Sequence, residues 1–406
     1  MTIPRTLPSG PAGIFQQAVE TRREDIVSLC ADLVAARSVN PDGDTRDAAA
    51  VVAAALQRFG IQARLERAVP TMPSVVAELD SGRPGRHLVL NVHLDTMPAG
   101  DETAWAVPIY ELTRREGLLY GLGMGNMKGA AAAMVHAVGL LAENPDAWNG
   151  RITFTAVSDE VVFGENGAAH LLRSIPGLAG DGLICGEGPG FKRLSIGEKG
   201  VLWLELSATG VAGHSSSIKQ GKSATARLAA VIAEVDRLNG MRVAVPAELS
   251  GLFPDDDPGF ELTANVGTIA AGTFIGQVAV DGRAEIDLRI PPGMTTDQAQ
   301  RMVTDIADSA GVTVRRIKGW DPNWTAPNSE LGRAWNSAST ALGLDAPVLA
   351  VRLPASDASR WRLLGVPALC YGPQPTLSAG VDDHAEEDEV LRCAALYAST
   401  AVAFLS

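Results

Sequence analysis

Several residues that could bind a metal or transfer a proton lie directly after short apolar runs. His93, Glu160 and Glu187 each follow such a run, which we predict to be a buried strand. Imidazole and carboxylate groups bind divalent metals and transfer protons, and strand ends are where a rigid sheet positions such groups. Asp95 follows His93 by two residues and is expected to orient it. These residues are therefore candidates for a metal site, although any one of them alone is weak evidence, since an isolated His at a strand end is more often a packed or surface residue.

Other polar motifs are weaker when taken alone. His384 lies in an acidic loop at residues 382–389, which by itself would be a solvated face. The stretch at residues 121–129 is rich in glycine but matches no nucleotide-binding loop. A dinucleotide loop would need glycine at position 126, and a phosphate loop would need glycine before Lys128 and Ser or Thr after it. His214 precedes three serines, but these lie outside any nucleophile elbow, so a polar loop is the better interpretation.

The composition is that of an ordinary globular protein with an acidic surface. The 406 residues include 34 Lys and Arg against 47 Asp and Glu, and the formal net charge is −13. This balance disfavours nucleic acid or an anionic membrane as the main partner. No apolar run is long enough to span a membrane, no signal-peptide pattern is present, and the four cysteines are scattered. These features predict a cytoplasmic protein.

Alternating helix and strand patterns occupy most of the chain, which indicates an α/β layer fold. The predicted helices lie at residues 14–37, 45–59, 128–142, 168–174, 329–342 and from 389 onward. The predicted strands lie at residues 74–79, 87–92, 152–157, 182–185, 348–352 and 368–371.

A different pattern lies between these segments. In order, it predicts a strand, a helix, two strands, a helix and a strand at residues 201–208, 224–238, 261–269, 276–290, 295–310 and 312–317. This β-α-β-β-α-β order is that of a ferredoxin-like unit. Because the chain is too long for one core, we predict two domains. Residues 1–200 and 319–406 would form a catalytic metal-binding domain, and residues 201–318 an inserted lid.

Taken together, the motifs resemble those of the M20 metallopeptidase family, the group of aminoacylase, carboxypeptidase G2 and acetylornithine deacetylase. The matching segments, in family order, are residues 91–96, 120–129, 158–160, 186–187, 213–216, 287–289 and His384. The resemblance implies a zinc-peptidase-like catalytic domain with a mixed central sheet and an inserted ferredoxin-like α+β lid. It also implies a homodimer or higher homo-oligomer, usually formed through the lid.

Two positions depart from the family pattern. The family binds two zinc ions with two histidines, a bridging aspartate and two further carboxylates, but here Asn126 takes the bridging position and Val161 replaces a carboxylate. The loss of two negative charges roughly matches the loss of one divalent ion, and asparagine bridges two cations poorly. We therefore expect one divalent ion per chain, Mn²⁺, Zn²⁺ or Co²⁺, held by His93, Asn126 and Glu187.

The resemblance also implies roles for the remaining motif residues. Glu160 would be the general base, and His384 would be either a fourth metal ligand or a substrate contact. His214 would reach across the dimer from the lid to stabilise a developing oxyanion. Arg289 would bind a substrate carboxylate through its planar guanidinium.

These roles predict hydrolysis of a C–N bond in a small carboxylate-bearing substrate. A site with one metal ion lacks the second Lewis acid that the family uses. We therefore expect an electron-poor substrate, which needs less activation. The specific expectation is an activity found in the family, hydrolytic deamination of an aromatic amine such as 5-nitroanthranilate to 5-nitrosalicylate and ammonia by nucleophilic aromatic substitution. One alternative is an N-acyl amino acid or dipeptide amidohydrolase. Another is a non-catalytic binding protein with the same fold.

Overall fold

The computed structural model describes residues 11–188, 190, 192–373 and 380–406. The N-terminal residues 1–10, which bear on the expected lack of a signal peptide, lie outside this part. The chain forms two compact units. Unit 1 comprises Met1–Ile196, Thr325–Ala350 and Ser356–Ser406, and unit 2 comprises Gly197–Trp324 and Val351–Ala355. The short segment Val351–Ala355, which we had placed in the catalytic domain, therefore groups with unit 2.

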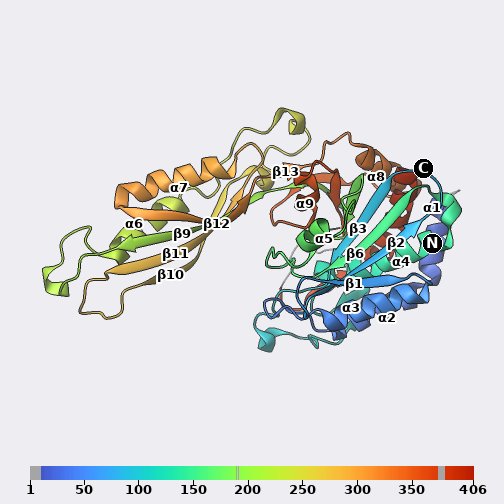
Figure 1. Cartoon of the computed structure of the whole chain (residues 1–406), viewed down its shortest axis with the longest axis horizontal. Helices are drawn as coiled ribbons and strands as arrows, with labels where there is room; N and C mark the ends of the chain where they lie inside the picture. Colours follow the sequence, from blue (N-terminus) through green and yellow to red (C-terminus); the bar gives the residue numbers. More distant parts are fainter. Residues whose placement is uncertain (1–10, 189, 191, 374–379) are drawn as a thin grey trace. The chain divides into compact units, whose positions relative to one another are not determined.

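Unit 1 is built on a mixed sheet, which confirms the predicted fold class (Figure 1). Its strands follow the order β1, β2, β6, β3, β7, β15, β8, and β14 also pairs with β8. The pairs β6–β3, β3–β7 and β7–β15 are parallel, whereas β1–β2, β2–β6 and β15–β8 are antiparallel. The strands are β1 (Ala63–Arg67), β2 (Pro73–Asp80), β3 (His87–His93), β6 (Arg151–Val157), β7 (Gly182–Cys185), β8 (Arg193–Glu198), β14 (Val348–Arg352) and β15 (Ala368–Cys370).

The central strands read as continuous apolar runs because the sheet buries both of their faces. Every residue of β3 is buried, for example. Helix α4 is Ala-rich, which lets it pack closely against β3, α2 and α10. The helices of unit 1 are α1 (Pro11–Thr21), α2 (Arg23–Ala35), α3 (Arg46–Arg58), α4 (Gly129–Glu143), α5 (Ala168–Ser174), α8 (Glu330–Ala341), α9 (Ala358–Leu363) and α10 (Glu387–Leu405). Among the described residues, no helix is long and apolar enough to cross a bilayer.

A small second sheet in unit 1 joins distant parts of the chain. It consists of β4 (Thr113–Arg115), β5 (Leu118–Tyr120) and β16 (His384–Glu386), in the order β16, β5, β4. His384 pairs with Tyr120 in this sheet, so the sheet fixes the position of the acidic loop.

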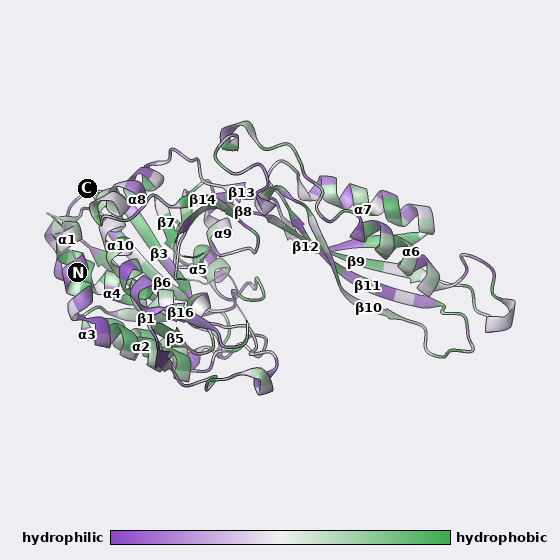
Figure 2. Cartoon of the chain, turned by 180° about the vertical axis from the view of Figure 1, so that it is seen from behind, coloured by the Kyte–Doolittle hydropathy of each residue, from purple (hydrophilic) through white to green (hydrophobic). Residues whose placement is uncertain are grey.

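Unit 2 has the predicted ferredoxin-like order. Its elements are β9 (Gly200–Thr209), α6 (Ala224–Asp236), β10 (Thr263–Ala271), β11 (Asp281–Ile290), α7 (Thr296–Ala310) and β12 (Val312–Trp320), followed by the short β13 (Asn323–Trp324). The sheet order is β10, β11, β9, β12. The helices α6 and α7 lie on one sheet face, and α7 alternates hydrophobic and hydrophilic residues (Figure 2). Along β11, Ile286 and Leu288 enter the core, whereas Asp287 and Arg289 point to the other face.

Most predicted elements differ from the structure by one to three residues at an end, and two differ more. The helix expected at residues 14–37 is two helices, because Arg22 leaves the helical conformation with φ −102° and ψ 16°. This break lets α1 pack on α10 while α2 packs on α3 and α4. The strand expected at residues 276–290 begins only at Asp281, because residues 274–277 form a turn in which Gln277 N donates to Phe274 O.

An ion-pair network at the start of α10 yields a stability prediction. The buried Glu387 accepts hydrogen bonds from Arg23 at 2.6 Å and from Arg114 at 2.6 and 2.8 Å, and these bonds lower its pKa. Glu387→Gln should therefore lower the free energy of unfolding by about 2 kcal/mol at neutral pH. A lowered pKa gives stability that is present above the unfolded-state pKa and lost as the pH falls through the lower folded-state pKa, so the difference should shrink below about pH 4.

Urea unfolding at neutral and acidic pH measures this difference. Glu143→Gln is the control, because Glu143 pairs with Arg22 at the surface and should contribute less than about 1 kcal/mol. Equal losses in the two variants, or a loss for Glu387→Gln that does not change with pH, would contradict the prediction.

Candidate active site

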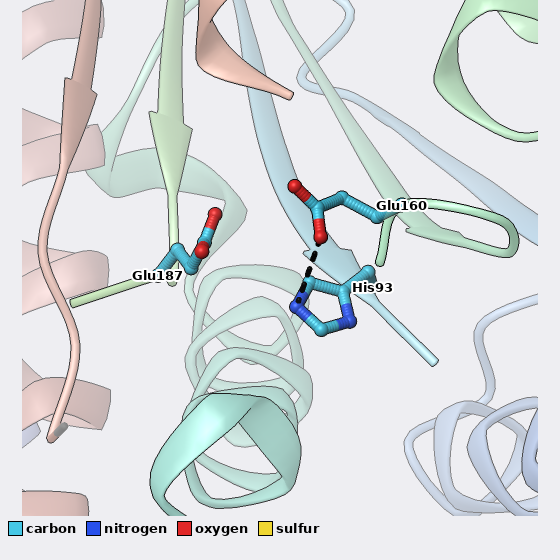
Figure 3. Close-up of side chains that lie close together, drawn as sticks. All are labelled: His93, Glu160 and Glu187. Carbon is cyan, nitrogen blue, oxygen red and sulfur yellow. Dashed lines mark ion pairs between the residues drawn. The ribbon is translucent and has the colours of Figure 1, made fainter. Parts of the chain in front are cut away.

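Three predicted site residues meet because they follow three adjacent parallel strands. His93 ends β3, and Glu160 and Glu187 follow its two neighbours β6 and β7. Since parallel strands end at the same edge of a sheet, their side chains converge there. One ligand atom from each residue lies within 4.8 Å of the others, and all three residues are buried (Figure 3).

The hydrogen bonds of His93 define which ring nitrogen faces the other two residues. Nδ1 lies 2.8 Å from the main-chain oxygen of Asp95, which can only accept, so Nδ1 carries the proton. The basic Nε2 lies 3.7 Å from a carboxylate oxygen of Glu160 and has no hydrogen-bond partner among the described residues. A lone pair that faces carboxylates inside a buried site is suited to a bound cation.

Asp95 orients His93 in a different way from the one expected. The main-chain oxygen makes the close contact, whereas the carboxylate lies 3.6 Å from Nδ1. That carboxylate instead accepts the main-chain N–H groups of Glu160 at 3.2 Å and Val161 at 3.0 Å. Asp95 therefore supports both the candidate ligand and the candidate base.

The loop that carries Glu160 is tightly held. Asp159 has a left-handed φ of 64°, and its carboxylate accepts two hydrogen bonds from Asn166, at 3.0 Å from the main chain and 2.8 Å from the amide. Gly164 is required nearby, because a Cβ there would lie only 1.9 Å from Asp159 Oδ2. A rigid loop of this kind is what a general base needs for a defined position.

Asn126 lies in a glycine-rich segment that a carboxylate of the chain itself holds in place. Asp383 accepts N–H groups of Gly123 at 2.7 Å and Gly125 at 2.9 Å, so these amides bind no phosphate. Burial raises the pKa of Asp383 to about 6 and lowers that of the neighbouring Lys128 to about 7. Asn126 Oδ1 is buried and has no hydrogen-bond partner in the described part of the chain, as expected for a potential ligand.

His384 lies outside the group formed by His93, Glu160 and Glu187. Its Nδ1 lies 2.9 Å from the main-chain oxygen of Asp382, which gives it the same tautomer as His93. The half-buried ring also packs 5.1 Å from the ring of Tyr120. His384 Nε2 is therefore a basic nitrogen, and its role as a ligand or substrate contact stays a prediction.

Sequence reasoning missed Asp357, a buried acid close to the site. Burial raises its pKa to about 7, and its carboxyl interacts electrostatically with His93, Glu187 and Asp95. Asp357 follows β14, so the search at strand ends could have found it. Its neighbours in the sequence, however, form no recognisable motif.

The two predicted lid residues lie in unit 2. The exposed His214 accepts the N–H of Ser216 on Nδ1 at 3.2 Å, so in the neutral ring Nε2 carries the proton and can donate. Arg289 donates to Asp287 Oδ2 on the same strand at 2.7 and 3.1 Å. A substrate carboxylate would have to share this guanidinium with Asp287.

Known proteins resemble this chain over most of its length. A succinyl-diaminopimelate desuccinylase of Stenotrophomonas maltophilia is 28% identical, covering 92% of this chain and 97% of the relative. Human carnosine dipeptidase 1 has a similar fold, with a TM-score of 0.77, 16% identity and coverage of 98% and 99% of the two chains. A dinuclear metal-binding M20 peptidase of Bacillus subtilis has a TM-score of 0.68 at 14% identity, covering 95% and 99%.

A family model matches residues 89–403, which include the three converging residues, Asn126, His214, Arg289 and His384. This match spans more than half of the chain and agrees with the fold and with the buried His93–Glu160–Glu187 group. The protein belongs to peptidase family M20/M25/M40 and is a metal-dependent hydrolase of carbon–nitrogen bonds.

Proposed function

We propose that the protein hydrolyses the amide bond of a small carboxylate-bearing substrate, an N-acyl amino acid or a dipeptide. The observation that carries this proposal is the buried group of His93, Glu160 and Glu187, with His93 Nε2 facing the carboxylates. The names of the relatives, a desuccinylase and a dipeptidase, favour this alternative over the aromatic-amine deamination that we had expected from the sequence. They also disfavour a non-catalytic binding protein.

The donor set fits a divalent metal. His93, Glu187 and Asn126 would hold it, and His384 would be a fourth ligand or a substrate contact. Such an ion, when bound, polarises a carbonyl and makes water easier to deprotonate. The asparagine at position 126 and the valine at position 161 support one ion per chain, Mn²⁺, Zn²⁺ or Co²⁺, rather than two.

The remaining steps belong to side chains of this protein. Glu160 takes a proton from the attacking water and later gives it to the leaving amine. The rigid loop, together with the hydrogen bond from the main-chain N–H of Glu160 to Asp95, keeps the Glu160 carboxylate near the reacting atoms. In the proposed dimer, His214 Nε2–H of one protomer would donate to the oxyanion that develops in its partner, and Arg289 would bind the substrate carboxylate.

An assay for two different products tests the proposed function. The purified protein, loaded with Zn²⁺ or Mn²⁺, is incubated with N-succinyl and N-acetyl amino acids, with dipeptides and with 5-nitroanthranilate. Release of a primary amine from an amide supports the proposal. Ammonia from 5-nitroanthranilate without amide hydrolysis would overturn it in favour of deamination.

Arg289 yields a prediction about substrate binding. Arg289→Ala should raise KM at least about 10-fold for a carboxylate-bearing substrate and change kcat less, because a charge-assisted pair is lost. Asp287→Asn should lower KM, since Asp287 competes for the same guanidinium. Steady-state kinetics on matched acid and amide substrates measure both effects, and an unaltered KM in both variants would exclude this anchor.

We also propose a homodimer formed through unit 2. β10 is an edge strand of its sheet, and the nearby apolar side chains Ile269, Phe274 and Ile275 are exposed, Ile275 by 95%. Edges and apolar groups of this kind are usually covered by another chain. Analytical ultracentrifugation should show a dimer, and the combined change Phe274→Asp and Ile275→Asp should give a monomer. A monomeric unmodified protein would contradict the proposal.

A cytoplasmic location stays a proposal. It is supported by the cysteines Cys30, Cys185, Cys370 and Cys393, all of which are buried and form no disulfide.

A further inference from the structure

A buried asparagine lies between two buried carboxylates beside the candidate active site. Asn40 Nδ2 donates to Asp95 Oδ2 at 2.9 Å and lies 3.4 Å from Asp159 Oδ1. All three residues are buried. The amide has two hydrogens, so it can serve both carboxylates, more weakly at the longer distance.

The two carboxylates hold the catalytic loop from both sides. Asp95 accepts the N–H groups of Glu160 and Val161, and its main-chain oxygen contacts His93. Asp159, next to Glu160, accepts two hydrogen bonds from Asn166. The amide of Asn40 is thus linked to His93 through Asp95. It is linked to Glu160 both through Asp95 and through Asp159, the preceding residue.

The environment explains why an amide occupies this position. Both neighbours act as acceptors, so only the NH₂ end of Asn40 fits between them. Two buried carboxylates repel each other, and a neutral group that donates to both lowers this repulsion without adding a charge.

The main chain fixes Asn40 independently of its side chain. Its N–H donates to Thr96 O at 2.8 Å, Thr96 N donates to Ser38 O at 2.9 Å, and Ser38 Oγ donates to Leu94 O at 2.7 Å. A substitution at position 40 therefore changes the contact with the carboxylates and leaves these main-chain contacts in place.

We propose that Asn40 is a positioning residue, which sets the placement of Glu160 and of His93 through Asp95 and Asp159. This inference rests on the proposed roles of Glu160 and His93, and it adds a role for Asn40 that the proposed function does not include. No contact of Asn40 with substrate is needed, because its effect passes through the two aspartates.

Two substitutions separate a donor from a residue that only fills space. Asn40→Asp keeps the size of the side chain but places a third carboxylate against the other two, whereas Asn40→Ala removes the donor and adds no charge. A space-filling role predicts that Asn40→Asp is the milder change. The positioning role predicts the opposite order, with kcat reduced about 10-fold by Asn40→Ala and about 100-fold by Asn40→Asp, and KM within about 3-fold.

Zinc affinity, measured by chelator competition, supplies a readout that does not depend on turnover. It should fall about 10-fold in Asn40→Asp and less in Asn40→Ala, because the support of His93 is disturbed. Asn144→Asp is the control, since Asn144 donates to Leu140 O at the far end of α4 and should change neither value. The melting temperature of each variant reports whether it folds.

The test compares the losses of kcat and zinc affinity in the two variants. Larger losses of kcat and zinc affinity in Asn40→Asp than in Asn40→Ala support the proposal. The reverse order, or unchanged values in both folded variants, overturns it. If the unmodified protein hydrolyses no amide, the proposed function fails, while the order of zinc affinities still tests Asn40.

Discussion

Glu160→Gln should lower kcat by at least about 1000-fold while the metal content per chain stays unchanged. Glutamine keeps the size of the side chain but cannot take a proton from water at neutral pH. The main-chain N–H of residue 160 would still donate to Asp95, so the loop keeps its position. Because the proposed ligands are His93, Asn126 and Glu187, the ion should still bind.

Steady-state kinetics and elemental analysis measure the two parts of this result. Glu165→Gln is a matched control, because Glu165 lies on the same loop, is exposed and pairs with Arg173 and Arg360. Its kcat should change less than about 2-fold. Unchanged turnover in Glu160→Gln would remove this residue from the mechanism, and a loss of the ion would make it a ligand instead of a base.

The combined change Asn126→Asp and Val161→Glu should raise the metal content from one ion to two per chain. It restores two negative charges at the positions where the family has carboxylates. A second divalent cation can then be held without leaving excess positive charge in a buried site. Without metal, the added carboxylates should lower the melting temperature, since buried like charges repel. Saturating Zn²⁺ should then raise it by more than in the unmodified protein.

Elemental analysis after dialysis against excess Zn²⁺ gives the number of ions, and thermal unfolding with and without Zn²⁺ gives the linked stability. Val162→Glu is the control, because it adds a carboxylate one residue away from the family position. Two ions already present in the unmodified protein would disprove the single-metal proposal. One ion in the double variant would disprove the charge argument.

The sequence could predict the converging residues because a simple topological rule applies to them. His93, Glu160 and Glu187 follow apolar runs that form adjacent parallel strands, and such strands end at one edge. The role of the Asp95 carboxylate could not be found in this way. It depends on the conformation of the loop after β6, which folds back so that two main-chain N–H groups reach that carboxylate.

The predicted fold is accurate where the sequence has a clear pattern, and it misses several strands that have none; these include β1, with five residues, and β8, with six. The helices and strands of unit 2 are long and periodic, and their order was predicted correctly. The strands β4, β5 and β16 have three residues each and were missed. So short a segment has no period to detect and takes its conformation from its pairing partners. Asn40 was missed for a related reason, since its importance comes only from what surrounds it.

The contact between Asp383 and the glycine-rich segment has a consequence for folding during synthesis, because its two sides are made at different times. Asp383 lies 260 residues after Gly123 in the sequence. While the chain emerges from the ribosome, the amides of Gly123 and Gly125 lack this acceptor until the acidic loop has been synthesised. The segment that carries Asn126 therefore reaches its final conformation late. Until Asp383 has been added, the growing chain therefore lacks the contact that holds this segment, and its site is incomplete.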